Sequence, residues 1–142
     1  MRRKQAKRLV QDRYVREIVE RLVNGLRRVD AIILFGSRAR GDWVPWSDYD
    51  VLVIAEFQEK YLDRIARILG LFSDLPVEVE PHPYTLEEAI QMLLRGNPII
   101  VDAIEEGVIL YQSPRLKMLL DTYMELKKRG LSRSKTSIIL PR

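Results

Sequence analysis

The stretch from Ile32 to Ile54 reads IILFGSRARGDWVPWSDYDVLVI, and it decides the fold of this chain. An apolar run ends at Phe35 and is followed by a turn at Gly36-Ser37 and a polar loop. A second apolar run begins directly after Asp48-Tyr49-Asp50. Short apolar runs bounded by turn residues are typical of buried strands. The stretch therefore predicts two strands joined by a turn and a loop, with two carboxylates at the start of the second strand.

The turn at Gly36 and Ser37 has the chemistry of a phosphate site. Glycine adopts backbone angles that are closed to other residues, and it has no side chain to hold an anion away from the main chain. We expect Ser37 to cap a short helix that begins near Arg38, so that unpaired N–H groups meet at one point. Arg38 and Arg40 follow directly and are candidates to neutralise phosphate charge. The alternative for both is a solvated loop arginine.

The two carboxylates of Asp48 and Asp50 are predicted to act as a metal-binding pair. Side chains on a strand alternate between its faces, so residues two apart leave the same face. Mg²⁺ binds few protein carboxylates and completes its octahedron with water and substrate phosphate oxygens. A phosphate-sized turn and a carboxylate pair together describe a site for a nucleoside triphosphate.

The order Gly36-Ser37, ten residues, Asp48, any residue, Asp50 resembles the signature of the DNA polymerase β-type nucleotidyltransferase superfamily. Within it, the chain is most similar to the small members called minimal nucleotidyltransferases. The resemblance is sharp over about residues 31 to 55 and looser to about Tyr111. It implies that Gly36 and Ser37 bind the triphosphate, while Asp48 and Asp50 bind the metal.

The resemblance also implies a third carboxylate, from a neighbouring strand, that joins the metal pair and acts as general base. Val77 to Glu80 alternates as a half-buried strand, so Glu78 and Glu80 share a face. We assign the role to Glu80, with Glu78 as the alternative; a solvated row of acids is the plainer interpretation. His82, between two prolines after this strand, is expected to be a solvated loop residue.

The activity implied by the resemblance is metal-dependent nucleotidyl transfer to an acceptor hydroxyl. ATP, or another nucleoside triphosphate, would be the donor, and two Mg²⁺ ions would stabilise the entering and leaving oxygens. Minimal members resemble one half of a pair whose partner is a small helical toxin of the HEPN class, which the antitoxin adenylylates. The contrasting hypothesis is a non-catalytic module that binds nucleotide or masks its partner.

The element order predicts an α/β fold over residues 1–142 as a single nucleotidyltransferase domain. Helical spacing of apolar residues covers Gln5 to Arg28, including Leu9 and Val10, and Phe57 to Phe72, where Leu62, Ile68 and Leu69 are among the residues expected to point inward. Capping patterns predict helices after Thr85 and Asn97, and the acids of the second of these, among them Asp102 and Glu105, are expected to form its solvated face. The resemblance implies a mixed sheet of about four strands with packed helices, the polymerase β-type palm. Strand order does not follow from the alternation alone.

Composition fits a globular cytoplasmic protein. The chain has 142 residues, 46% hydrophobic and 31% charged, with no cysteine and one histidine, which exclude disulfides and thiolate or histidine-rich metal sites. No apolar run approaches membrane-spanning length. The net charge of +4 is modest. Nucleic acid ranks last among partners, because the Arg and Lys residues are scattered on predicted helices that also carry acids. The tail from Leu131 to Arg142 is expected to fray, unless it adds a strand to a neighbouring subunit, and a homodimer is one option.

Overall fold

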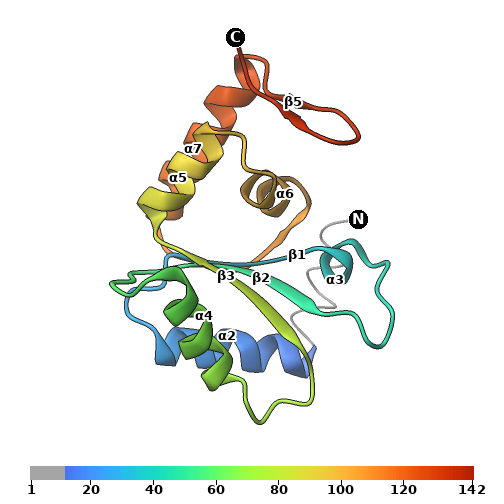
Figure 1. The fold of residues 1–142 in the computed structure, drawn as a ribbon, viewed down its shortest axis with the longest axis vertical. Helices are drawn as coiled ribbons and strands as arrows, with labels where there is room; N and C mark the ends of the chain where they lie inside the picture. The colour runs from blue at the N-terminus through green and yellow to red at the C-terminus, as the bar shows by residue number, and fades with distance from the viewer. Residues whose placement is uncertain (1–11) are drawn as a thin grey trace.

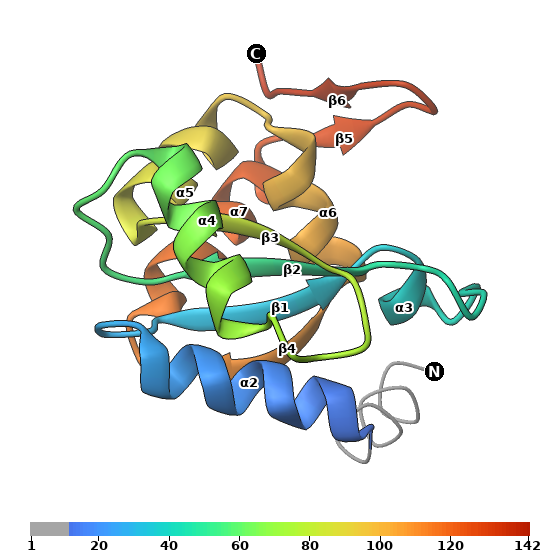
Figure 2. The ribbon, with the colours of Figure 1, turned by 60° about the horizontal axis from the view of Figure 1, so that its bottom comes forward.

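The computed structural model of the protein describes residues 12–142, and these residues form a mixed sheet with helices on both faces (Figures 1 and 2). The strand order is β3-β2-β1-β4, with β1 at Ala31–Phe35, β2 at Tyr49–Ile54, β3 at Val79–Tyr84 and β4 at Val108–Gln112. β1 pairs antiparallel with both β2 and β4, whereas β2 and β3 run parallel. The predicted four-stranded mixed sheet is confirmed.

The central strand of the sheet is β1, as its fully apolar sequence predicts. All five of its residues are buried, because strands flank it on both sides and helices cover both faces. β2 is nearly as apolar, and only Asp50 interrupts its burial. A strand that is buried on both faces needs apolar side chains at every position.

One face of the sheet is covered by α2 at Arg13–Gly25 and α4 at Tyr61–Leu71, and the other by α5, α6 and α7 (Figure 1). These three helices span Leu86–Leu94, Pro98–Glu106 and Leu116–Lys128. The predicted capping box is present, since Thr85 and Glu88 exchange side-chain to backbone hydrogen bonds. Asn97 caps α6, with Pro98 at the first turn, as predicted.

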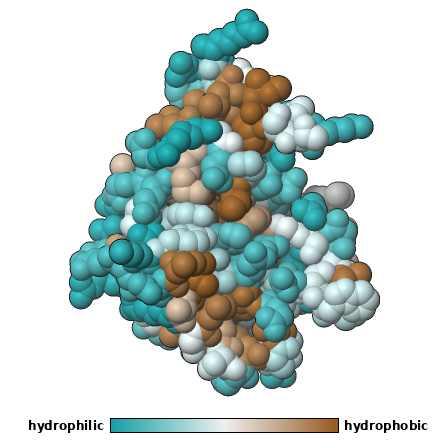
Figure 3. All heavy atoms as spheres, in the orientation of Figure 1, coloured by the Kyte–Doolittle hydropathy of each residue, from teal (hydrophilic) through white to brown (hydrophobic). Residues whose placement is uncertain are grey.

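The first predicted helix ends at Gly25 rather than Arg28, and the second spans Tyr61–Leu71 rather than Phe57 to Phe72. α2 is described from Arg13; the predicted positions before residue 12, including Leu9 and Val10, lie outside the described residues. Within α4, Ile68 is buried as predicted, but Leu62 is 77% exposed and Leu69 is 44% exposed. Figure 3 shows hydrophobic atoms gathered on the surface over α4. The prediction that Leu62 and Leu69 point inward is therefore wrong, because the helix buries a narrower face than its apolar stripe.

The third predicted strand is displaced. The sequence pattern placed it at residues 77–80, whereas β3 runs from Val79 to Tyr84 and includes Pro81 and Pro83. β3 is an edge strand of the described sheet, and the backbone polar groups of its even-numbered residues point toward β2. The carbonyls of Glu78 and Tyr84, for example, accept hydrogen bonds from the backbone N–H groups of Tyr49 and Ala55. Both prolines are odd-numbered and lie on the open side, where no ladder hydrogen bond is lost.

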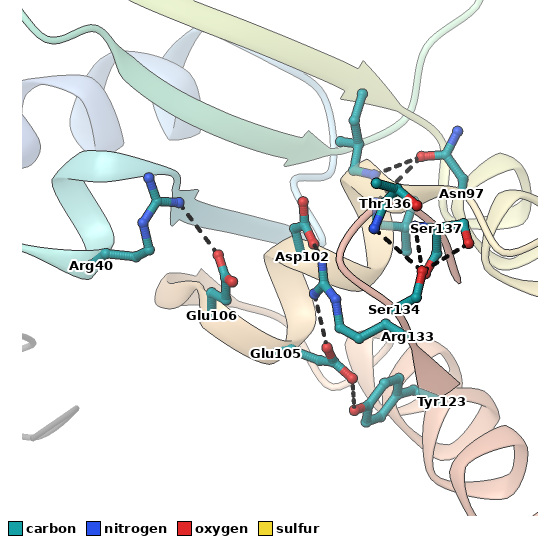
Figure 4. A network of polar contacts seen from close by, with 12 residues as sticks. Arg40, Asn97, Asp102, Glu105, Glu106, Tyr123, Arg133, Ser134, Thr136 and Ser137 are labelled. Atoms are coloured by element: carbon teal, nitrogen blue, oxygen red, sulfur yellow. Dashed lines mark hydrogen bonds and ion pairs between the residues drawn. The ribbon is translucent and has the colours of Figure 1, made fainter. Parts of the chain in front are cut away.

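The C-terminal residues form a hairpin of their own, so the expectation of a frayed tail is wrong. β5 at Ser132–Arg133 pairs antiparallel with β6 at Ile138–Ile139. Arg133 forms ion pairs with Asp102 at 2.7 Å and Glu105 at 3.1 Å, both on α6 (Figure 4). The hairpin is thus tied to α6, and these two acids have a partner where the sequence suggested only a solvated face.

None of the helices described in residues 12–142 is both long enough and apolar enough to cross a membrane.

Candidate active site

The glycine turn and one of the two predicted carboxylates meet directly. Gly36 follows β1, and its neighbour Phe35 lies opposite Asp50 in the β1–β2 ladder. The backbone at Gly36 has φ 74° and ψ −159°, a region that is essentially restricted to glycine. A Cβ atom at residue 36 would collide with the Asp50 carboxylate. The turn therefore needs glycine for its conformation and for its contact with Asp50.

A second carboxylate and an imidazole join Asp50. In the parallel β2–β3 ladder, Glu80 lies opposite Asp50 and His82 lies opposite Leu52, so strand alternation puts Glu80 and His82 on one face of β3. Each of Asp50, Glu80 and His82 offers a ligand atom within 4.8 Å of the other two. Two carboxylates with a nearby nitrogen fit a divalent cation, and the carboxylate oxygens suit Mg²⁺. The cluster thus contains Asp50, a predicted metal ligand, and Glu80, the predicted third carboxylate. Its third member is His82, which was predicted to be a solvated loop residue.

The other predicted metal ligand, Asp48, lies at the margin of this cluster. It is exposed, directly precedes β2 and is two residues from Asp50. With Glu78, Glu80 and His82 it lines an open pocket of about 350 Å³ between β3 and α4. Its charge is also close enough to raise the pKa of Glu80. Asp48 thus shares the pocket with the cluster but is not one of its three members.

The two carboxylates of the cluster have opposite pKa shifts. Contact with Asp50 is the main cause that raises the pKa of Glu80, and burial adds to it. Burial also pushes the pKa of Asp50 upward, but contacts with His82 and Glu80, and the charge of Arg40, lower it by more. Two carboxylates at this distance repel one another when both are ionised. A proton taken up by the pair therefore goes to Glu80, and Asp50 stays ionised.

The short helix after the turn begins one residue earlier than predicted. α3 spans Ser37–Arg40, its N-cap residue is Gly36, and no side chain caps it. Ser37 is therefore the first residue of the helix, and the prediction that its hydroxyl caps the helix is wrong. The Gly36 carbonyl accepts the backbone N–H groups of Ala39 and Arg40, which makes the turn compact.

The two arginines of α3 point to different partners. The Arg38 guanidinium donates to the carbonyls of Ser47 and Pro45 and lies 4.5 Å from the ring centre of Trp43. Arg38 thus stabilises the loop of residues 41–48, in which Trp46 remains 80% exposed.

Arg40 links α3 to α6 and also acts on the acidic cluster. It forms ion pairs with Asp42 at 3.3 Å and with Glu106 at 3.4 Å (Figure 4). Its charge contributes to the lowered pKa of Asp50. Of the two predicted phosphate-neutralising arginines, Arg40 is the one whose field reaches the cluster.

His82 is the residue that the sequence interpretation placed wrongly. Its side chain is 14% exposed, its Nε2 lies 3.9 Å from Asp50 Oδ1, and its ring centre is 5.2 Å from that of Phe35. The signal was present in the sequence: alternation of apolar and polar residues continues from Val79 through Pro81 and Pro83, with Glu80 and His82 between them. Proline usually argues against a strand, but β3 contains both Pro81 and Pro83.

Comparison with known proteins agrees with this geometry. The sequence model of the nucleotidyltransferase domain family matches residues 12–119. A bifunctional uridylyltransferase/uridylyl-removing enzyme of Pseudomonas entomophila is 29% identical over 126 residues, which are 83% of this chain but 14% of that enzyme. A candidate protein adenylyltransferase of Methanocaldococcus jannaschii is 31% identical over 106 residues, 71% of this chain and 98% of the relative.

Solved structures share the fold at low sequence identity. A toxin–antitoxin crystal structure with AMP-PNP has a TM-score of 0.55 and 20% identity, and covers 80% of this chain and 89% of that one. A candidate nucleotidyltransferase from Sulfolobus solfataricus has a TM-score of 0.51 and 21% identity, with 77% and 85% of the two chains covered. The family match, the relative matched over nearly its whole length and the shared fold agree: the chain belongs to the nucleotidyltransferase domain family.

Proposed function

We propose that the protein transfers a nucleoside monophosphate, AMP from ATP, to an acceptor hydroxyl in a Mg²⁺-dependent reaction. One observation carries the proposal: Gly36, in a conformation that only glycine adopts readily, lies against the carboxylate of Asp50. A backbone turn suited to phosphate and an ionised carboxylate within contact distance of it is the arrangement that a metal-bound triphosphate requires. Residues 1–142 would act as one domain.

The donor would bind between the turn and the acids. Backbone N–H groups at Gly36 and Ser37 would receive the terminal phosphates, and Arg40 adds positive charge beside them. Asp48, Asp50 and Glu80 would hold the metal. When bound, two Mg²⁺ ions would neutralise phosphate charge and stabilise the entering and leaving oxygens. For Arg38, a role at the phosphates stays a prediction, because its guanidinium is engaged with its own loop.

The chemical step would be an in-line displacement at the α-phosphorus. The acceptor oxygen forms a bond to phosphorus, the bond from phosphorus to the oxygen bridging the β-phosphate breaks, and pyrophosphate leaves with the electron pair. The acceptor proton goes to a carboxylate. Glu80 suits this role better than Glu78, because Glu80 lies opposite Asp50 in the ladder and belongs to the cluster, whereas Glu78 lies outside it.

The acceptor we propose is a hydroxyl on a partner protein, in the setting of a small helical toxin of the HEPN class. The relative from Methanocaldococcus jannaschii, matched over nearly its whole length, is named a candidate protein adenylyltransferase. A structural neighbour of the same fold was crystallised as a toxin–antitoxin complex with AMP-PNP.

The test is a transfer assay with ATP labelled on the α-phosphate, purified partner protein and Mg²⁺. Asp48→Asn should abolish transfer and leave the fold intact, because Asp48 is exposed and removal of its charge costs little stability. Asp63→Asn is the matched control: it makes the same change at an exposed position on α4, and should transfer at the rate of the parent. If Asp48→Asn also transfers at the parental rate, the site assignment is wrong. If calorimetry shows that the parent binds Mg-ATP but no label is transferred, the non-catalytic module replaces the enzyme.

A further inference from the structure

One nitrogen donor lies among the oxygen donors of the acidic cluster. His82 sits two residues beyond Glu80 on the same face of β3, and its Nε2 is 3.9 Å from Asp50 Oδ1. That separation is too long for a hydrogen bond. It suits two donors that face a common point, since ligand atoms of Asp50, Glu80 and His82 all lie within 4.8 Å of one another.

The imidazole of His82 is held in place by its surroundings. Its neighbours on both sides are prolines, which fix the backbone φ angles before and after it. Its ring packs on Phe35 with centres 5.2 Å apart and an interplanar angle of 56°, and its side chain is 14% exposed. Phe35 also precedes Gly36 in the chain. The histidine is therefore ordered beside the turn before any ligand arrives, and ordering it on binding would cost little entropy.

The chemistry of this donor set differs from that of an all-carboxylate site. Mg²⁺ prefers oxygen ligands in a near-ideal octahedron and usually keeps several waters. Imidazole is a good ligand for iron, nickel, copper and zinc, and the affinity of a nitrogen and oxygen site for divalent first-row metals rises from Mn²⁺, the weakest case, to Cu²⁺. A fixed histidine therefore raises the affinity of the cluster for a transition metal and adds little to its affinity for Mg²⁺.

We propose that His82 is a direct ligand in the Asp50–Glu80 metal site and raises the affinity of the site for a divalent transition metal, with Mn²⁺ as the probe, relative to its affinity for Mg²⁺. The inference rests on the proposed function only in placing a metal at Asp50 and Glu80. The nitrogen ligand and the selectivity go beyond that function.

The test uses the full chain without a histidine tag, because His82 is then the only histidine in the protein. Mn²⁺ is added to the protein alone, with no nucleotide, and pulsed electron paramagnetic resonance records whether a nitrogen nucleus of an imidazole is coupled to the bound ion. Mn²⁺ and Mg²⁺ affinities are measured in parallel, by titration of free Mn²⁺ and by competition with Mg²⁺. Both readouts are independent of transfer activity.

The expected result is an imidazole nitrogen signal in the parent that His82→Asn abolishes. Mn²⁺ affinity should fall at least roughly 10-fold in His82→Asn, because loss of a direct ligand should cost no less than loss of an outer-shell partner, which costs about 10- to 100-fold. Mg²⁺ affinity should change by less than about threefold, since the carboxylates that Mg²⁺ prefers are retained. His82→Phe, which keeps the ring packing against Phe35 without a nitrogen, should give the same loss. Glu78→Gln, in the same pocket but outside the cluster, should leave the nitrogen signal and the selectivity unchanged.

Bound Mn²⁺ without a nitrogen signal in the parent, or parental Mn²⁺ affinity in both His82 variants, would overturn the inference. The measurement on the parent decides the question even if a variant fails to fold. The proposed function fails on a different result, parental transfer by Asp48→Asn, so the two hypotheses are separable.

Discussion

Replacement of Gly36 by alanine tests the contact on which the site depends. Gly36 has φ 74° and ψ −159°, and an added Cβ atom would collide with the Asp50 carboxylate. The Asp50 side chain cannot simply withdraw, because Asp50 lies within β2 and its neighbour Val51 is fully buried. Alanine must therefore either strain the turn or displace the carboxylate, and both outcomes disturb the same site.

The cost follows from two contributions. An alanine held in a backbone region that belongs to glycine costs about 1–3 kcal/mol. Overpacking against a neighbour that cannot move freely adds about 1–3 kcal/mol. A total of about 2–6 kcal/mol corresponds to a fall in Tm of roughly 4–24 °C in a domain of this size. If the carboxylate shifts by about 1 Å, the transfer rate should fall by about 100-fold.

The assay compares Gly36→Ala with Gly70→Ala by differential scanning calorimetry and by transfer of labelled AMP. Gly70 lies in α4, has no positive φ and would place its Cβ in open space. The same chemical change there should raise stability by up to about 1 kcal/mol, because alanine favours the helix, and should leave transfer unchanged. A Gly36→Ala protein that unfolds within about 2 °C of the parent and transfers AMP normally would refute the reasoning.

Three further predictions concern stability. Asp30 is fully buried and pairs with Arg115 at 3.3 Å and with the Ser113 hydroxyl at 3.0 Å, so Asp30→Ala, which leaves the Ser113 hydroxyl without its acceptor, should lower the free energy of unfolding by about 1–3 kcal/mol in urea denaturation. Arg64 lowers the pKa of Glu88 below its ordinary value of 4.5, so the carboxylate stabilises the fold above about pH 4.5 and loses this effect as pH falls through its folded pKa. The Tm difference between the parent and Glu88→Gln should therefore shrink as pH is lowered from 6 to about 3. Arg133→Gln should speed amide exchange in residues 132–139 while changing overall stability by less than about 1 kcal/mol, because its ion pairs are partly exposed.

Features that depend on neighbouring residues could be predicted from the sequence. The apolar run at Ala31 to Phe35 predicts a strand that is covered on all sides, and β1 is that strand. Thr85 and Asn97 begin α5 and α6, because the groups that cap a helix lie within three residues of its first turn. The turn at Gly36 could be predicted in the same way, from Gly36 and Ser37 directly after an apolar run. Its contact with Asp50 arises because β2 pairs with β1.

Features that depend on distant residues could not be predicted. Asp30 is stabilised by Ser113, 83 residues away, and neither residue carries a local signal for that contact. The apolar stripe of α4 predicts burial of Leu62, but which part of the stripe is buried depends on where α2 and β3 pack against it. The sequence alone assigns Arg133 to a loose basic tail, because its partners Asp102 and Glu105 lie about 30 residues earlier on α6.

His82 lies within a strand because β3 is at the edge of the sheet, where prolines are tolerated on the open side. A proline in a central strand would remove a ladder hydrogen bond, so proline within a run argues against a strand. Within residues 12–142, β3 pairs with a strand on one side only. Pro81 and Pro83 lie on the other side, where the Pro83 carbonyl accepts a hydrogen bond from Arg64. The same prolines prevent another chain from pairing with this edge, since they leave no N–H groups at those positions. The edge is thus closed to strand addition, while Glu80 and His82 on the same strand lie beside Asp50 of β2.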